Sequence, residues 1–250
     1  MTREEAAQIL RSGFGKALLQ EAMRVSTAIY WGTPVRGQTP RIRNSGTVVV
    51  LDAGQRPFAV SAHHVLEGYR QDLAQDPGLV CYVSNEIYEP LRHIIAEDPR
   101  HDLVSLSLSE SVFQAVRDKV HVHPLASWPP TPPQQGKGVF FGGYRGQDRE
   151  QHADRLVLGF MGGVGIATAV TEDRVTIQFE REEWVHSETL QEPAPNAPWG
   201  GASGGPVFAL VQNGAMSWQL AGIISEFSTE YEILIAHSLR HFRPDGRLAA

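Results

Sequence analysis

The stretch PWGGASGGPV, residues 198–207, surrounds a single serine, Ser203, with four glycines. Glycine permits positive φ angles and a close approach of neighbouring backbone. A nucleophile that attacks a carbonyl needs this freedom, because its loop must turn N–H groups toward the same point as the serine Oγ. The stretch therefore predicts that Ser203 is a nucleophile and that the N–H groups of Gly201 and Ser203 form an oxyanion hole. A glycine-rich surface turn is the alternative interpretation.

Two further stretches carry the side chains that such a serine needs, since a serine is unreactive without a base. VSAHHVL, residues 60–66, presents two histidines directly after a predicted strand. HDLVSLSL, residues 101–108, places Asp102 at the head of a strand in which apolar and polar side chains alternate. Taken alone, each motif is also compatible with a structural histidine or a surface aspartate.

Together the three motifs resemble those of the trypsin-like (chymotrypsin-fold) serine peptidases. Residues 61–65 resemble the family's Thr-Ala-X-His-Cys/Val motif, residues 102–106 resemble Asp-(Ile/Leu)-Ala-Leu-Leu, and residues 201–206 match Gly-X-Ser-Gly-Gly-Pro. The resemblance covers residues 45–245. It implies an endopeptidase that hydrolyses peptide bonds through an acyl-enzyme, with Ser203 as nucleophile, His64 as base and Asp102 orienting His64.

The resemblance also selects between neighbouring candidates. In the family motif, a cysteine or a small apolar residue follows the catalytic histidine, and Val65 fits that position, so the base is assigned to His64 rather than His63. Asp98 is the rival acid. Pro99 and Arg100 separate Asp98 from the strand, which favours Asp102.

Substrate binding is also inferred from the resemblance. It places Ala197 at the base of the side-chain pocket and matches Ser225, Glu226 and Phe227 to the strand that pairs with substrate. Ala197 offers no charge to hold lysine or arginine, and Phe227 narrows the pocket, so we expect a small or medium apolar side chain at the cleaved bond. Ala202 stands where digestive members carry aspartate, so the chain resembles stand-alone bacterial or intracellular members more than digestive ones.

The overall organisation indicates an all-β protein, because many short strands follow one another without long helices between them. The stretch WPPTPPQQ, residues 128–135, favours an extended connection between two β units. The family resemblance makes these units two six-stranded Greek-key barrels with the active site between them. The predicted domains are a helical extension over 1–40, a first barrel over 41–127, a proline-rich linker over 128–136 and a second barrel over 137–250.

The helical extension is predicted from its first residues. Thr2 and Glu5 form a capping box, apolar side chains follow on one helical face, and residues 16–24 predict a second helix. These helices are a candidate docking surface for a regulatory protein partner.

Bulk composition excludes several classes of protein. The 250 residues are 42% hydrophobic with a formal charge of −6, which disfavours a partner such as nucleic acid or an anionic membrane. No apolar stretch approaches the roughly 18 residues of a membrane helix, and the first residues, MTREEAAQIL, do not form a secretory signal. A cytoplasmic protein is therefore expected.

The single cysteine, Cys81, excludes an intramolecular disulfide, and we interpret it as a buried small hydrophobe. No metal or organic cofactor is expected. The spacing of four histidines does not indicate a metal site, and we interpret them as ordinary surface or core residues: His93, His101, His121 and His123.

Two other functions remain open at this stage. One is a catalytically silent peptide-binding pseudo-protease that uses the same cleft. The other is an esterase, because residues 201–205 formally match Gly-X-Ser-X-Gly. The order Ser, Asp, His of that fold does not fit these motifs, and alternation of strands with long helices is missing.

Overall fold

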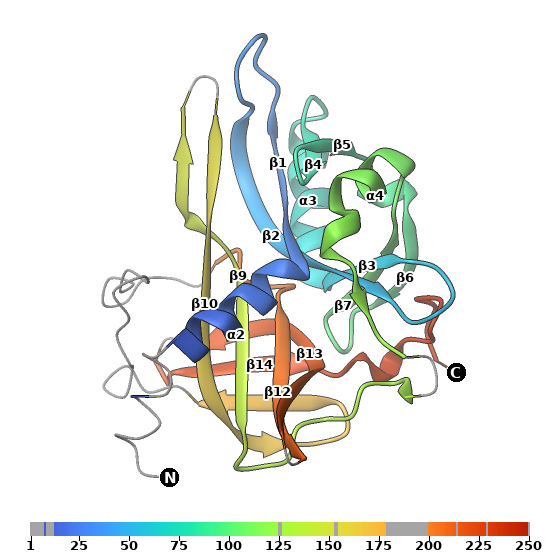
Figure 1. Cartoon of the computed structure of the whole chain (residues 1–250). Coiled ribbons are helices and arrows are strands. Elements are labelled where there is room, and N and C mark those ends of the chain that lie inside the picture. Colours follow the sequence, from blue (N-terminus) through green and yellow to red (C-terminus); the bar gives the residue numbers. More distant parts are fainter. Residues whose placement is uncertain are drawn as a thin grey trace.

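The structure is a computed structural model that describes residue 8 and residues 13–124, 127–152, 155–178, 200–213, 215–228 and 230–249. This part of the chain forms an eight-stranded sheet followed by a closed six-stranded barrel. Figure 1 shows how the two are arranged. None of its helices is long and apolar enough to cross a membrane.

The N-terminal half builds the eight-stranded sheet. Its elements, in chain order, are α2 (Gly15–Arg24), β1 (Ser26–Thr33), β2 (Arg41–Asp52), β3 (Phe58–Ala62), α3 (His63–Gln75), β4 (Val80–Val83), β5 (Glu86–Tyr88), η2 (Pro90–Arg92), β6 (Ile94–Asp98), β7 (Leu103–Ser107), α4 (Glu110–Val116), η3 (Arg117–Lys119) and β8 (His121–Val122). The strand order is β5-β4-β1-β2-β3-β7-β6, and β8 pairs with β2.

The C-terminal half builds the barrel. Its elements are β9 (Gly138–Gln151), β10 (Leu156–Val170), β11 (Arg174–Gln178), β12 (Pro206–Asn213), β13 (Ala215–Ser228), β14 (Ile233–His237) and η6 (Leu239–His241). The closed order β10-β11-β14-β13-β12-β9 is a Greek-key arrangement. The N-terminal sheet has the same order in its six main strands, but its hydrogen-bonded path is open between β4 and β6.

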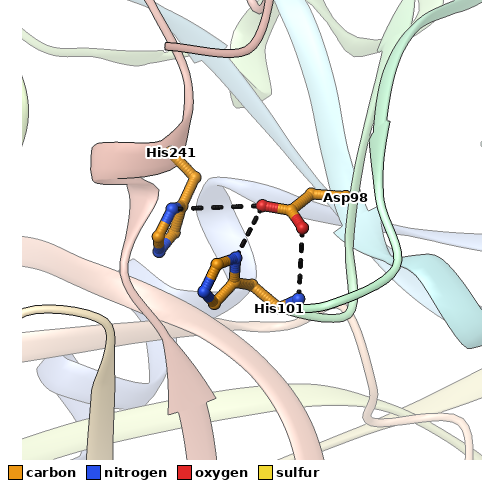
Figure 2. Close-up of side chains that lie close together, drawn as sticks. All are labelled: Asp98, His101 and His241. Carbon is orange, nitrogen blue, oxygen red and sulfur yellow. Dashed lines mark hydrogen bonds and ion pairs between the residues drawn. The ribbon is translucent and has the colours of Figure 1, made fainter. Parts of the chain in front are cut away.

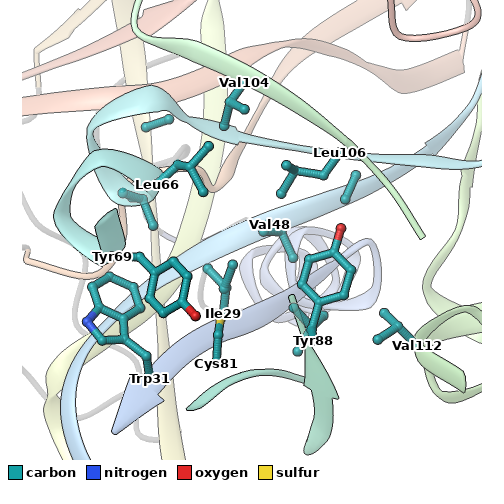
Figure 3. Packing of buried hydrophobic residues seen from close by; sticks show 14 of the residues in the cluster. Ile29, Trp31, Val48, Leu66, Tyr69, Cys81, Tyr88, Val104, Leu106 and Val112 are labelled. Carbon is teal, nitrogen blue, oxygen red and sulfur yellow. The ribbon is translucent and has the colours of Figure 1, made fainter. Parts of the chain in front are cut away.

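Buried side chains form separate cores inside each sheet and a third core between them. The core of the N-terminal sheet contains Trp31, Leu66, Tyr69 and Cys81, and Figure 3 shows how these side chains pack. Cys81 is only 1% exposed, which confirms its interpretation as a buried small residue. Burial also raises the pKa of its thiol, so the reactive thiolate is disfavoured.

The third core joins the two halves. It combines side chains of both sheets with the buried face of α2, including Leu18, Val49, Leu51, Phe140 and Phe208. Helix α2 lies across β9 and β10 (Figure 1), and its residues Leu18 and Ala22 are fully buried. The two sheets are thereby held against each other along a continuous apolar interface.

The predicted all-β fold of two Greek-key barrel units with an N-terminal helical extension is confirmed, and the first unit carries two strands, β5 and β8, beyond the predicted six. The predicted boundary at residue 40 is corrected, because β1 already belongs to the sheet and pairs with both β2 and β4. Of the two predicted N-terminal helices, the first lies mostly outside the described residues, while α2 buries its apolar face within this chain. The predicted linker 128–136 falls between the end of β8 and the start of β9.

Candidate active site

His64 and Asp102 are joined by two hydrogen bonds. His64 lies at the start of α3, directly after β3, and Asp102 lies in the turn between β6 and β7. The ring nitrogen Nδ1 of His64 is 2.7 Å from Oδ2 of Asp102, and the backbone N–H of His64 donates to Oδ1 over 2.8 Å. One carboxylate thus holds both the ring and the backbone of His64, which limits rotation of the imidazole.

The backbone of Asp102 is also held in an unusual conformation. Its φ angle of 50° is in the left-handed region, which aspartate tolerates better than most residues. Its carbonyl accepts a hydrogen bond from the N–H of His63 over 3.0 Å. Asp102 therefore satisfies two N–H groups of the first turn of α3, which has no side-chain cap at Ala62.

The rival residues have other partners. Nε2 of His63 lies 3.2 Å from Oε1 of Glu97, which also accepts a hydrogen bond of 2.7 Å from Arg70. Asp98 accepts hydrogen bonds from the backbone and the ring of His101. The carboxylate of Asp102 therefore contacts the ring of His64, whereas it is the backbone carbonyl of Asp102 that binds His63.

Ser203 lies in a tight loop just before β12. Gly201 and Gly204 have φ angles of +96° and +89°, which a residue with a side chain rarely adopts. A Cβ at Gly204 would overlap the backbone oxygen of Thr47 and the hydroxyl of Ser61. The loop is thus pressed against β2 and β3, and β3 leads directly into His63 and His64.

Thr47 on β2 binds this loop with two hydrogen bonds and β9 with a third. Its backbone N–H donates to the carbonyl of Ser203 over 2.9 Å, and its hydroxyl donates to the carbonyl of Gly201 over 2.8 Å. The same hydroxyl accepts the N–H of Tyr144 over 2.9 Å. The sequence analysis missed this role of Thr47, because a threonine in a β-branched strand carries no local signal for a contact more than 150 positions away.

Gly46, which precedes Thr47 on β2, lies against the start of α3, which carries His64. A Cβ at Gly46 would meet the side chain of Val65, the residue after His64. Consecutive residues of β2 therefore support the Ser203 loop and the start of α3, so the two parts of the candidate site share one strand. Among the described residues, Ser203 Oγ makes no hydrogen bond, and the His64 ring bonds only to Asp102.

The N–H groups of Gly201 and Ser203 were predicted to form an oxyanion hole. None of the hydrogen bonds found in the described part of the chain uses either group as a donor. Gly204 and Gly205, by contrast, donate to Ile224 and Ala202 over 2.8 and 2.9 Å. The N–H groups of Gly204 and Gly205 thus hold the turn in place, while those of Gly201 and Ser203 are available to a ligand.

The predicted substrate strand lies beside this loop. Ser225 interrupts the pairing of β13 with β14 as a bulge, and its hydroxyl donates to the carbonyl of Ile235 over 3.2 Å. Glu226 is exposed, whereas Phe227 is partly buried against the barrel core. The two side chains therefore point to different faces of β13, as the alternation of a strand requires. Ala197 lies outside the described residues.

One edge of β13 is open beside the serine loop. β12 begins at Pro206, opposite Ile223, and Ile224 exchanges hydrogen bonds with Gly204 and Gly205. Beyond this point, no strand of the described ranges pairs with Ser225 or Glu226 on the side opposite β14. An extended peptide could add there as a further strand.

Comparison with known proteins gives one family. A family model described as a trypsin-like peptidase domain matches residues 44–216. No curated protein matches the chain. One similar solved structure comes from work on the coupled folding and binding of the intrinsically disordered Sesbania mosaic virus VPg protein. It is 12% identical over 85% of this chain and 85% of that chain, with a TM-score of 0.42.

Proposed function

The chain belongs to the trypsin-like peptidase family, and from this we propose that it is a serine endopeptidase with Ser203 as nucleophile, His64 as base and Asp102 as the residue that orients His64. The observation that carries the proposal is the two-point contact of the Asp102 carboxylate with the ring and backbone of His64. The side chain of His64 is 51% exposed, so a substrate can reach it.

The proposed reaction has two steps. With Nδ1–H donated to Asp102, Nε2 of His64 is the free lone pair that accepts the proton of Ser203 Oγ as this oxygen attacks the peptide carbonyl. The protonated ring then donates to the leaving amine, which departs and leaves an acyl-enzyme. Water, deprotonated by the same histidine, attacks the ester, releases the acid and restores Ser203.

The charge that develops on the carbonyl oxygen requires fixed donors. The N–H groups of Gly201 and Ser203 are proposed for this role, because they belong to the nucleophile's own turn and are not used elsewhere among the described residues. Since the turn is fastened to Thr47, these donors need little reorganisation during the reaction.

Substrate is proposed to bind as an extended strand along Ser225 and Glu226, next to the nucleophile. Phe227 and the uncharged Ala197 favour a small or medium apolar side chain before the cleaved bond, such as alanine, valine or leucine. A buried lysine or arginine without an acidic partner would cost several kcal/mol. Cleavage of a peptide library randomised at this position measures the preference, and dominant cleavage after lysine or arginine would contradict it.

Covalent labelling tests the central claim. A fluorophosphonate probe reacts with an activated serine, so the full chain should be labelled once, at Ser203, as located by mass spectrometry of the digested protein. Ser203→Ala should abolish labelling, and His64→Ala should slow it strongly, whereas Ser111→Ala, at an exposed serine of α4, serves as the matched serine control. A chain that binds peptides but is not labelled would be the silent pseudo-protease.

Labelling does not separate a peptidase from an esterase, so a second measurement is needed. The purified protein should cut peptide bonds in a proteome-derived library, and the N-termini of the fragments report the cleavage sites. Turnover of activated esters without any peptide cleavage would contradict the endopeptidase.

A further inference from the structure

A second cluster of histidine and aspartate lies close to the candidate active site. Asp98 ends β6, His101 lies in the turn that follows, directly before Asp102, and His241 lies in η6 after the barrel. Figure 2 shows the two imidazole rings side by side, with the carboxylate of Asp98 directed toward both. The cluster thus combines residues from both halves of the molecule.

The distances suit a single ion. Oδ2 of Asp98 is 2.7 Å from Nδ1 of His101 and 3.9 Å from Nδ1 of His241. One potential ligand atom from each residue lies within 4.8 Å of the other two. The rings of His101 and His241 stack with their centroids 3.7 Å apart, so neither ring needs to travel far to present a nitrogen to the same point.

The surroundings hold these ligands in place. Oδ1 of Asp98 accepts the backbone N–H of His101 over 3.2 Å, which orients the carboxylate. Nε2 of His241 lies 3.2 Å from Oδ1 of Asp173, although the two are not aligned as a hydrogen bond. If Nδ1 of His241 faces an ion, this arrangement places a carboxylate behind the opposite nitrogen, as is usual for histidine ligands.

A buried nitrogen without a partner lies near the cluster. Nδ1 of His237 is buried and makes no hydrogen bond within the described structure, although a buried imidazole nitrogen normally has a partner. The ring of His237 is 6.0 Å from that of His101, in an edge-to-face arrangement. This region therefore contains more buried polar atoms than its hydrogen bonds satisfy.

We propose that Asp98, His101 and His241 bind a zinc-class divalent transition-metal ion that ties the β6–β7 turn to the segment after the barrel. Two imidazole nitrogens and one carboxylate oxygen are typical Zn²⁺ ligands, whereas Ca²⁺ and Mg²⁺ prefer a full shell of oxygens. The ion replaces the proton shared by His101 and Asp98, and water fills its fourth position. The three side chains are 14–16% exposed, so an ion can reach them from solvent.

The position of the site predicts what the ion does. It would link an element of the N-terminal sheet to one that follows the barrel, and so stabilise the folded state by mass action. Binding does not depend on the proposed peptidase activity, because none of the three ligands belongs to the proposed triad.

Isothermal titration of the untagged full chain with Zn²⁺ tests the proposal. We expect one tight site per chain, and at a free Zn²⁺ concentration of a hundred times Kd a rise in Tm of about 5–10 °C. His241→Ala should weaken binding at least tenfold and reduce the Tm shift at the same Zn²⁺ concentration to about half or less. His152 provides the matched control, because it is exposed and its ring lies near Glu150 rather than near any residue of the cluster. His152→Ala should bind Zn²⁺ as tightly as the unaltered chain does.

Two further measurements keep the test decisive. If His241→Ala does not fold, Asp98→Asn takes its place, and Co²⁺ added to the unaltered chain should give the visible absorption of a low-symmetry histidine–carboxylate site. His64→Ala should still bind Zn²⁺ with unchanged affinity. This result would show that the ion does not bind at the His64–Asp102 pair. Absence of Zn²⁺ binding at 100-micromolar-scale concentrations, or equal binding by the chain and its His241→Ala and Asp98→Asn variants, would overturn the proposal.

Discussion

His63 and His64 are neighbours in the sequence, and each lies beside a carboxylate, yet their surroundings differ. The side chain of His63 is 16% exposed, and its partner Glu97 also binds Arg70. The side chain of His64 is 51% exposed, and Asp102 contacts both its ring and its backbone. One histidine belongs to a shared ion-pair network inside the structure, while the other is held by one acid and open to solvent.

Pairing with a carboxylate is therefore not enough to make a histidine a base. Glu97 divides its charge between His63 and a guanidinium, which is always protonated. Asp102 makes no ion pair with a lysine or arginine in the described part of the chain and is therefore available to stabilise a protonated His64. Exposure is the second difference between the two histidines. A base must reach the proton that it removes, and the side chain of His64 is the more exposed of the two.

The largest expected effect separates the two histidines. His64→Ala and Ser203→Ala should each lower kcat at least about 10⁴-fold, because nucleophile and base act as one unit. His63→Ala should cost less than about tenfold, since it removes only a partner of Glu97. Steady-state kinetics on a peptide substrate found from the library measures all three variants. Loss of activity in His63→Ala with retention in His64→Ala would reverse the assignment.

The carboxylates of Asp102 and Glu97 are expected to differ in the same way as the histidines that they contact. Asp102→Asn preserves shape but turns an amide N–H toward Nδ1 of His64, which favours the wrong tautomer, so kcat should fall by about 10⁴-fold. Glu97→Gln should lower kcat by less than about tenfold. Comparable losses in both variants would mean that Glu97 also has a role in catalysis, which would contradict the prediction. Circular dichroism of both proteins controls for misfolding.

A pair of glycines tests whether the serine loop depends on contact with β2 and β3. Gly204→Ala should lower the free energy of unfolding by about 2–5 kcal/mol, because its φ is positive and the added carbon overlaps Thr47. Gly200→Ala is the matched control, since a Cβ there meets nothing within 4 Å. Urea unfolding measures both. Equal stability of the two variants would show that the loop does not pack as described.

A third kind of histidine extends the comparison to stability. Burial lowers the pKa of His121 to about 4, so burial, rather than an acid, keeps this ring neutral in the folded chain. In the unfolded chain the ring protonates near the ordinary value of about 6.5. The unfolded state therefore binds the extra proton between about pH 6.5 and 4, and folding stability falls as the pH is lowered through that range.

The expected loss attributable to His121 is about 2–3 kcal/mol. Urea unfolding at several pH values between 7.5 and 4 should show a smaller decline for His121→Asn than for the unaltered chain, by that amount. Parallel declines in the two proteins would mean that His121 is not held neutral by the fold.

Much of the candidate site could be read from local patterns. The glycines around Ser203, the histidines after a strand and the aspartate at a strand head each reflect what a few consecutive residues need. Helix α3 was missed, although Val65, Leu66 and Tyr69 mark a buried helical face. The strand β1 was assigned to the helical extension, although its run STAIYWGT is aromatic and β-branched.

Local patterns are enough to predict an all-β chain and the stretches that carry its chemistry, because backbone conformation and side-chain alternation are local properties. Which histidine meets which acid depends instead on how the elements pack in three dimensions. Successive residues of a helix point about 100° apart, so the start of α3 directs His63 to Glu97 and His64 to Asp102. The contact of His241 with Asp98 likewise depends on tertiary packing, because the two residues are more than 140 positions apart in the chain.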